Sequence, residues 1–167
     1  REKFPQATVF WEPLQQYMVA ENLAELRAIL PHVDMVSPNL LEAHQTYGLQ
    51  DPVELVRAML DDGAGVVALR MGEAGSLVGA RGYAELVRVP AVEVPEIVDQ
   101  TGAGNTYCGA FLVGWLETGD LTVAACYGAV AASFALEVTG VADPPPDLAT
   151  VRDQRVAWLR DRIRAVN

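Results

Sequence analysis

A seven-residue segment, Asp99–Asn105 with the sequence DQTGAGN, has the composition of an anion-binding loop. It stands between a β-prone stretch and the strongest helix candidate of the chain, Gly102–Glu117. The small residues Gly102, Ala103 and Gly104 allow backbone N–H groups to approach a ligand closely. The helix that follows points the positive end of its dipole at the same place, so the segment predicts a binding site for a phosphate group.

Two common phosphate-binding motifs do not match this segment. No Gly-Lys-Ser/Thr follows it, which excludes a Walker A loop, and Gly102 and Gly104 lack a third glycine three residues later, which excludes the dinucleotide fingerprint. Taken alone, the segment is also compatible with an ordinary glycine-rich helix start. Thr101 is expected either to cap the helix or to donate to a phosphate, and Asp99 to close an Asx-type turn unless it serves a ligand.

The elements around this loop predict a single layered α/β domain over residues 1–167, with a mostly parallel sheet. The expected strands are Thr8–Trp11, Val33–Val36, Gly65–Leu69 and Ser76–Ala80, with an edge strand and connection over Tyr83–Val94. The expected helices are Glu21–Leu30, Leu40–Tyr47, one that starts at Asp51-Pro52, Gly102–Glu117, Leu121–Glu137 and, after a break at Pro144–Pro146, an amphipathic Leu148–Val166.

The amino-acid composition limits the kinds of protein to which the chain can belong. The chain has 167 residues and 51% apolar residues, enough for one buried core. Twelve basic and twenty-two acidic side chains give a net charge of −10, which argues against nucleic acid and membrane surfaces as partners. Cys108 and Cys126 form no metal or disulfide pattern, so a reducing, cytoplasmic location is expected. The chain begins at Arg1 without a methionine or a signal peptide, and we expect a piece of a longer protein or a processed product.

Several motifs in this order resemble the ribokinase/PfkB family of carbohydrate kinases. Asp99–Asn105 is similar to the family's Asp-x-Thr-Gly-Ala-Gly-Asp at six of seven positions, if the variable second position is allowed. Asn39–Glu42 resembles its Asn-x-x-Glu motif, and Arg70–Gly75 resembles a strand-turn-strand element beside the nucleotide. Gly128–Gly140 resembles the alanine-rich helix that lines the adenine pocket. The resemblance spans roughly residues 9–141, most of the chain.

The resemblance implies a fold and an activity. It implies the C-terminal portion of a ribokinase-like three-layer α/β/α sandwich, without the N-terminal half that carries the lid and the sugar-recognising carboxylate. The implied reaction is phosphate transfer from ATP to a hydroxyl of a sugar or a nucleoside, with Mg²⁺ and, in some members, K⁺. Pairing through the lid implies a homodimer for the full-length protein.

The resemblance also assigns roles to individual residues. Backbone amides of Gly102, Ala103 and Gly104 would form the anion hole, and Asp99 would lie near a monovalent-cation site. Glu42 would hold Mg²⁺ through water. The residues expected to bind the nucleotide are Asn39, Glu42, Gly72, Gly75 and Thr101. For Asn39 and Glu42 a plain helix cap is the alternative, and for Gly72 and Gly75 a plain turn.

Asn105 is the main departure from the family pattern. The family places an aspartate there, which accepts the proton of the attacking hydroxyl, and an amide has no such basic site at neutral pH. Loss of a general base costs about 10²–10⁴-fold in rate. The sequence therefore leaves two hypotheses open: a kinase whose base lies elsewhere, and a weakened pseudokinase that acts as a nucleotide-binding or protein-interaction module.

Overall fold

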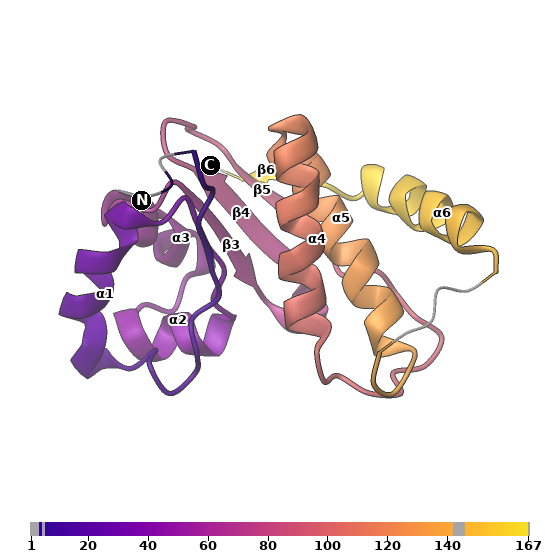
Figure 1. Cartoon of the computed structure of the whole chain (residues 1–167), viewed down its shortest axis with the longest axis horizontal. Helices are drawn as coiled ribbons and strands as arrows, with labels where there is room; N and C mark the ends of the chain where they lie inside the picture. Colours follow the sequence, from indigo (N-terminus) through magenta and orange to yellow (C-terminus); the bar gives the residue numbers. More distant parts are fainter. Residues whose placement is uncertain (1–3, 5, 142–145, 167) are drawn as a thin grey trace.

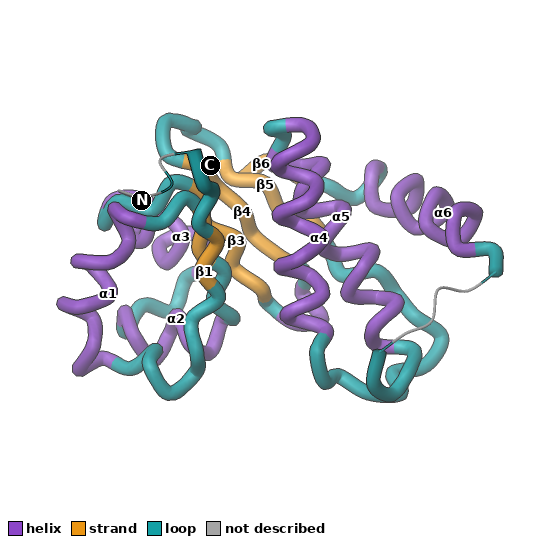
Figure 2. Tube along the Cα trace, in the orientation of Figure 1, coloured by secondary structure: helices purple, strands orange, loops and turns teal. Residues whose placement is uncertain are grey.

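The computed structural model describes residue 4, residues 6–141 and residues 146–166, so Pro144 and Pro145 of the expected chain break lie outside the described residues. In this part of the chain, six strands form one sheet with a helical layer on each face (Figures 1 and 2). Helices α1 (Leu23–Ile29), α2 (Leu40–Tyr47) and α3 (Pro52–Asp61) cover one face. Helices α4 (Ala103–Thr118) and α5 (Leu121–Leu136) cover the other, with α6 (Leu148–Arg160) beside them. The three-layer sandwich expected from the sequence is confirmed.

The sheet is mixed. Its strands lie in chain order as β1 (Phe10–Trp11), β2 (Met35–Val36), β3 (Val66–Arg70), β4 (Ser76–Ala80), β5 (Leu86–Val89) and β6 (Arg164–Val166). Strands β1 to β3 pair in parallel, and β3 to β6 pair antiparallel. The prediction of a mostly parallel sheet was therefore wrong. The connections after β3 and β4 are only a few residues long, too short for the crossover that a parallel pair requires.

Short 3₁₀ turns mark the ends of several elements. They are η1 (Ala20–Asn22), η2 (Leu30–His32) and η3 (Gly72–Ala74). The first two flank α1, where the sequence predicted a single helix over Glu21–Leu30. The third is the predicted tight turn between β3 and its antiparallel partner β4. The predicted positions of the other helices before the chain break agree with the structure to within one residue at their starts.

Strand β3 joins two hydrophobic cores, one on each face of the sheet. Val66 and Ala68 belong to the core under α4 and α5, whereas Val67 and Leu69 belong to the core under α1 to α3. All four side chains are buried, as expected for a strand covered on both faces. In the core under α4 and α5, Phe111 is fully buried against Phe10 and Tyr107, and it fixes α4 on the sheet.

The C-terminal segment differs from its prediction. The sequence predicted one amphipathic helix over Leu148–Val166, but the helix ends at Arg160 and the residues Arg164–Val166 form β6 beside β5. Ile163 packs against the core under α4 and α5, and Val166 packs against the opposite core. A strand can place side chains on both faces of the sheet in this way, which one helical stripe cannot. As a consequence β5 is an inner strand, and the prediction of an edge strand there was wrong.

One arginine of α6, Arg155, is directed toward α5 and not toward solvent. Arg155 lies mostly buried over the ring of Phe134, with its Nη2 at 2.6 Å from Glu137 Oε2 and its Nη1 donating to Ser133 Oγ at 2.8 Å. Glu137, which follows the last residue of α5, is thus paired with a cation. These contacts attach α6 to α5.

The two thiols are expected to be unreactive in the folded chain. Cys108 and Cys126 are free and buried, and burial raises the pKa of both, that of Cys126 to about 11. The thiolate is the reactive form, so modification by Ellman's reagent at pH 8 should be at least ten-fold slower than for an exposed cysteine with an ordinary pKa. Unfolding in guanidinium should release both thiols. Rapid modification of the folded chain would contradict this burial.

In the described part of the chain, no helix combines the length and apolar character that crossing a membrane requires.

Candidate functional site

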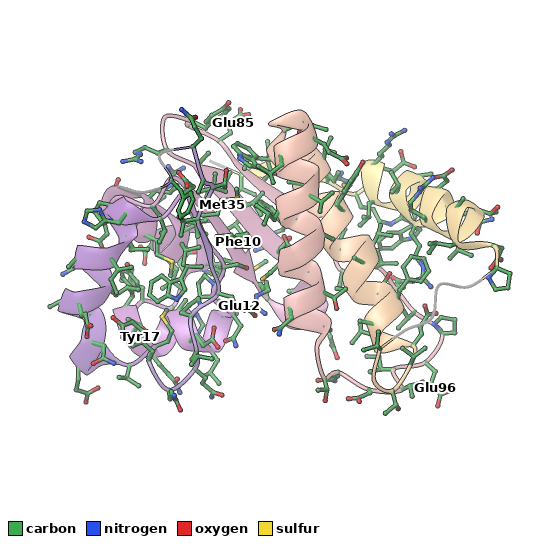
Figure 3. The ribbon with its side chains drawn as sticks, in the orientation of Figure 1. Phe10, Glu12, Tyr17, Met35, Glu85 and Glu96 are labelled. Atoms are coloured by element: carbon green, nitrogen blue, oxygen red, sulfur yellow. The ribbon has the colours of Figure 1, made fainter. Side chains whose placement is uncertain are left out.

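The carboxyl ends of the three parallel strands meet at one edge of the sheet. Glu12 directly follows β1, Ser37 directly follows β2, and Arg70 is the last residue of β3. In open α/β sheets this edge is where ligands bind. Figure 3 shows Glu12 beside the end of α4 at which that helix begins, whereas Glu85 lies at the opposite end of the sheet.

Arg70 holds the three strand ends together. Its Nη2 lies 2.9 Å from Glu12 Oε1 and donates to the Ser37 carbonyl at 2.9 Å. Its backbone N–H donates to the Pro38 carbonyl at 3.0 Å. The side chain is only 15% exposed, and its Nε is buried without a hydrogen-bond partner among the described residues. The guanidinium therefore places a positive charge at this edge of the sheet, with its Nη1 toward Gly104.

The predicted anion-binding loop lies directly against this arginine. A Cβ atom at Gly104 would collide with Arg70 Nη1 and would lie 3.5 Å from Glu12 Oε1. Only glycine therefore lets the guanidinium lie over the loop in this position. The result is a cation placed beside the start of a helix, where backbone N–H groups already favour negative charge.

The start of α4 has no side-chain cap. Gly102 occupies the N-cap position with a φ of 84°, a left-handed conformation that favours glycine. The Ala103 N–H donates to the Gln100 carbonyl at 3.3 Å, so it is already engaged, and the following Gly104 faces the guanidinium. Thr101 does not cap the helix, which leaves its side chain exposed in the loop.

Asp99 closes an Asx turn. Its Oδ1 accepts a hydrogen bond from the Thr101 N–H at 2.8 Å, and this bond holds the pKa of the carboxyl below its usual value. The structure thus places Asp99 in the loop-forming role that the sequence offered as one alternative. No cluster of three or more metal-ligating side chains occurs among the residues described, so the cation role of Asp99 stays a prediction.

Asn39 and Glu42 form a capping box at the start of α2. The Asn39 side chain accepts from the Glu42 N–H at 2.9 Å, and Glu42 Oε2 accepts from the Asn39 N–H at 2.7 Å. Glu42 is only 5% exposed, and its burial raises the pKa of its carboxyl, although the hydrogen bond from Asn39 and the charge of Arg70 act in the opposite direction. The helix-cap alternative is therefore present, and it brings both residues beside Arg70.

Asn105 faces Glu12. With the amide oriented to satisfy its neighbours, Asn105 Nδ2 donates to Glu12 Oε2 at 3.1 Å and to Glu12 Oε1 at 3.3 Å. The carboxylate of Glu12 thus bridges Arg70 on β3 and Asn105 in the first turn of α4. No sequence motif predicted this pairing.

Arg70, Asn39 and Gly104 line a cavity of about 720 Å³, a size typical of small-molecule sites, and Glu12 and Asn105 contact this lining without being part of it. One end is polar and is lined by Asn39, Arg70 and Gly104. The other end is apolar, between α5, α6 and the connection from β5 to α4, and its lining side chains are Val92, Val94, Ile97, Ala129, Ala132, Leu136 and Trp158. The cavity suits an elongated ligand with an anionic end and a flat apolar end.

The structure gathers half of the predicted site residues into this cavity. The predicted residues that line it are Asn39, Gly72, Gly75, Ala103 and Gly104. The others among the described residues, which lie near it without lining it, are Glu42, Asp99, Thr101, Gly102 and Asn105. Sequence reasoning missed Glu12 and gave Arg70 no role. Their positions directly at the ends of short buried strands were the available signal, because such ends meet at one sheet edge.

Comparison with known proteins agrees with this geometry. A model of the pfkB family carbohydrate kinases matches residues 7–148. The cytidine kinase of Thermococcus kodakarensis is 34% identical over 117 residues, and an uncharacterized protein of Schizosaccharomyces pombe is 29% identical over 158. The crystal structure of adenosine kinase from Sinorhizobium meliloti superposes with a TM-score of 0.74 at 27% identity, covering 88% of this chain and 44% of that one.

The chain spans less than half the length of these relatives. The alignments cover 80% of this chain and 44% of the Schizosaccharomyces protein, and 69% of this chain and 41% of the cytidine kinase. The family model nevertheless covers most of the present sequence, and the structure has the same layered fold. The chain belongs to the pfkB family of carbohydrate kinases.

Proposed function

We propose that this chain supplies the nucleotide side of a kinase that transfers phosphate from ATP to a hydroxyl group of a sugar or nucleoside. The observation that carries the proposal is the cavity, which joins the glycine loop and Arg70 to an apolar slot beside α5. Among relatives, a cytidine kinase, an adenosine kinase and ribokinases support this class of reaction. The small residues Ala129 and Ala132 leave room for a flat base, and the N–H groups at the start of α4 suit its phosphates.

The residues at the polar end fit a magnesium nucleotide. Mg²⁺ keeps several waters and is usually held by one or two carboxylates together with substrate phosphates. Asn39 lines this end, and the carboxylate of Glu42, which accepts the Asn39 N–H, would hold Mg²⁺ through water, while Glu12 and Arg70 neutralise each other. Bound Mg²⁺ would neutralise charge that develops on the transferred group.

A second candidate is a nucleotide-binding module without phosphate transfer. Asn105 favours it, because its amide already donates to Glu12 and cannot accept a proton from a hydroxyl. The two candidates differ in one result. The kinase releases ADP when a suitable acceptor is present, whereas the module binds ATP and releases none.

Gly104→Asp is expected to abolish nucleotide binding. The new carboxylate would displace Arg70 and place negative charge where the phosphates bind, so we expect at least a hundred-fold weaker affinity for a non-hydrolysable ATP analogue with Mg²⁺. Isothermal titration calorimetry measures this. Gly109→Asp is the matched control, because Gly109 lies one to two turns along the same helix, is exposed, and has open space around its Cβ position.

Three results of this binding experiment would decide whether the nucleotide site is where we propose it. Saturable binding to the wild type and to Gly109→Asp, but not to Gly104→Asp, supports the nucleotide site. Equal binding to all three would place the nucleotide elsewhere. A folded wild-type protein of natural full length that gives no binding heat at several temperatures would contradict the proposed function.

A further inference from the structure

We propose that Glu12 is the catalytic base of this site and takes the proton from the acceptor hydroxyl in place of a carboxylate at position 105. The inference rests on the proposed function. It starts from the pairing of Glu12 with Asn105, whose Nδ2 lies 3.1 Å and 3.3 Å from the two carboxylate oxygens. Asn105 in the first turn of α4 and Glu12 directly after β1 thus form one amide–carboxylate pair, in which Glu12 supplies the carboxylate.

Other carboxylates near the cavity are placed differently. Glu42 is buried and accepts the Asn39 N–H within the capping box. Glu73 and Glu93 line the cavity, but they are exposed and lie in the turn after β3 and in the connection after β5. In the part of the chain that the structure describes, Glu12 is the carboxylate that contacts both Arg70 and Asn105.

The environment of Glu12 suits a base that becomes available when nucleotide binds. Its side chain is 29% exposed, so a hydroxyl can reach it, and Oε1 lies 3.5 Å from the Cβ position of Gly104. The charged and titratable groups around it are Arg70, Glu42 and Cys108. The Nη1 of Arg70 faces Gly104, so a phosphate bound at the loop would compete with Glu12 for the guanidinium and could release Glu12 Oε1.

The transfer step then balances as follows. The acceptor hydroxyl oxygen forms a bond to the γ-phosphorus of ATP, and its proton goes to a Glu12 carboxylate oxygen. The bond between the γ-phosphorus and the bridging oxygen breaks, and its electron pair stays on that oxygen of ADP. Glu12 returns the proton to water after the products leave. Arg70 and the N–H groups at the start of α4 stabilise charge on the phosphoryl group in transit.

The test exchanges the amide and the carboxylate. Glu12→Gln keeps the size of the side chain and an oxygen that can accept from Arg70, but it removes the base, so kcat should fall about 10²–10⁴-fold with little change in nucleotide affinity. The double variant Glu12→Gln/Asn105→Asp restores one carboxylate at the same place with the same net charge. We expect the kcat of the double variant to be at least ten-fold higher than that of Glu12→Gln alone.

The measurements use the protein in its natural full length, with ADP release as the readout and ribose, fructose, adenosine and cytidine as acceptors. Recovery of kcat in the double variant is a result that a merely structural role of Glu12 would not produce. Glu85→Gln is the matched control, because Glu85 is exposed at the far end of the sheet (Figure 3). Circular dichroism and analogue binding establish that each variant is folded.

Five outcomes decide whether Glu12 is the base. Loss in Glu12→Gln with recovery in the double variant supports Glu12 as the base. Full turnover by Glu12→Gln overturns it, and so does a loss that the double variant does not repair. A wild type that binds the ATP analogue but releases no ADP with any acceptor also overturns it, while leaving the nucleotide site intact. A wild type that binds no nucleotide removes the proposed function, and this inference with it.

Discussion

Gly75→Ala is expected to lower the free energy of unfolding by about 3–5 kcal/mol. Gly75 has φ 83° and ψ −130°, a conformation that side chains of L-residues rarely adopt. A Cβ atom there would also collide with the Val89 carbonyl and lie 2.6 Å from the Ala91 nitrogen. Both neighbours are backbone atoms, one in the last residue of β5 and one in the connection that follows it, so neither can move aside as a flexible side chain would. Backbone strain and overpacking each contribute about 1–3 kcal/mol.

The neighbouring Gly72 provides a control in the same turn. It also has a positive φ, 58°, but a Cβ atom there would meet nothing within 4 Å. Gly72→Ala should therefore cost only about 1 kcal/mol, the strain of a left-handed residue by itself. Urea unfolding followed by tryptophan fluorescence measures both losses. Equal losses in the two variants would show that the contact with β5 does not hold the turn in place.

The variants Gly75→Ala and Gly72→Ala also distinguish a structural role of these glycines from a role in nucleotide binding. The residues that Gly75 approaches, Pro90 and Ala91, line the cavity together with both glycines. The sequence predicted Gly72 and Gly75 as residues that bind the nucleotide, with a plain turn as the alternative. Gly75 fulfils the structural role by letting η3 pack on β5. Gly72 has no such packing role, so a reduced nucleotide affinity in the more stable Gly72→Ala would report contact with the ligand.

Most helices and strands could be predicted from the sequence, because the spacing of apolar residues follows the periodicity of the element that buries them. The sequence predicted α4 as its strongest helix candidate, and the aromatic residues Tyr107, Phe111 and Trp115, which recur at helical spacing, form or flank the buried face of that helix. The apolar run Gly65–Leu69 predicted the strand β3, and the structure shows that this strand is covered on both faces. The C-terminal strand was missed, because Arg164–Val166 gains its stability from pairing with β5, which no local pattern records.

The candidate site also has one part that could be predicted from adjacent residues and another that could not. The glycine loop could be predicted, since its conformation and its helix start are properties of adjacent residues. The contact of Glu12 with Arg70 and Asn105 joins positions 58 and 93 residues further along the chain, and it depends on the lateral order of the strands. Sequence reasoning alone placed Arg70 on a strand end without stating what it faces. The structure shows that the Arg70 side chain faces Glu12.

Arg70→Ala is expected to have the largest combined effect on stability and binding. It removes the ion pair with Glu12 and the hydrogen bond to the Ser37 carbonyl, and it leaves the Glu12 carboxylate without its cation. Breaking a buried pair costs about 3–5 kcal/mol, and the 29% exposure of Glu12 reduces this to about 2–3 kcal/mol. Loss of a charged donor at the loop should weaken the affinity for an ATP analogue about 10–100-fold.

Two comparisons isolate the cause of this loss. Arg27→Ala removes an ion pair with Asp62 at 3.0 Å, but the Arg27 side chain is 54% exposed, so this control should cost no more than about 1 kcal/mol. A double-mutant cycle of Arg70→Ala with Glu12→Gln should show a coupling energy of at least about 1 kcal/mol, because the second change removes the uncompensated charge that the first creates. Additive losses would mean that the two side chains stabilise the strand ends independently. Nucleotide affinity should fall in every variant that lacks Arg70, because the guanidinium borders the phosphate end of the cavity whether or not position 12 carries a charge.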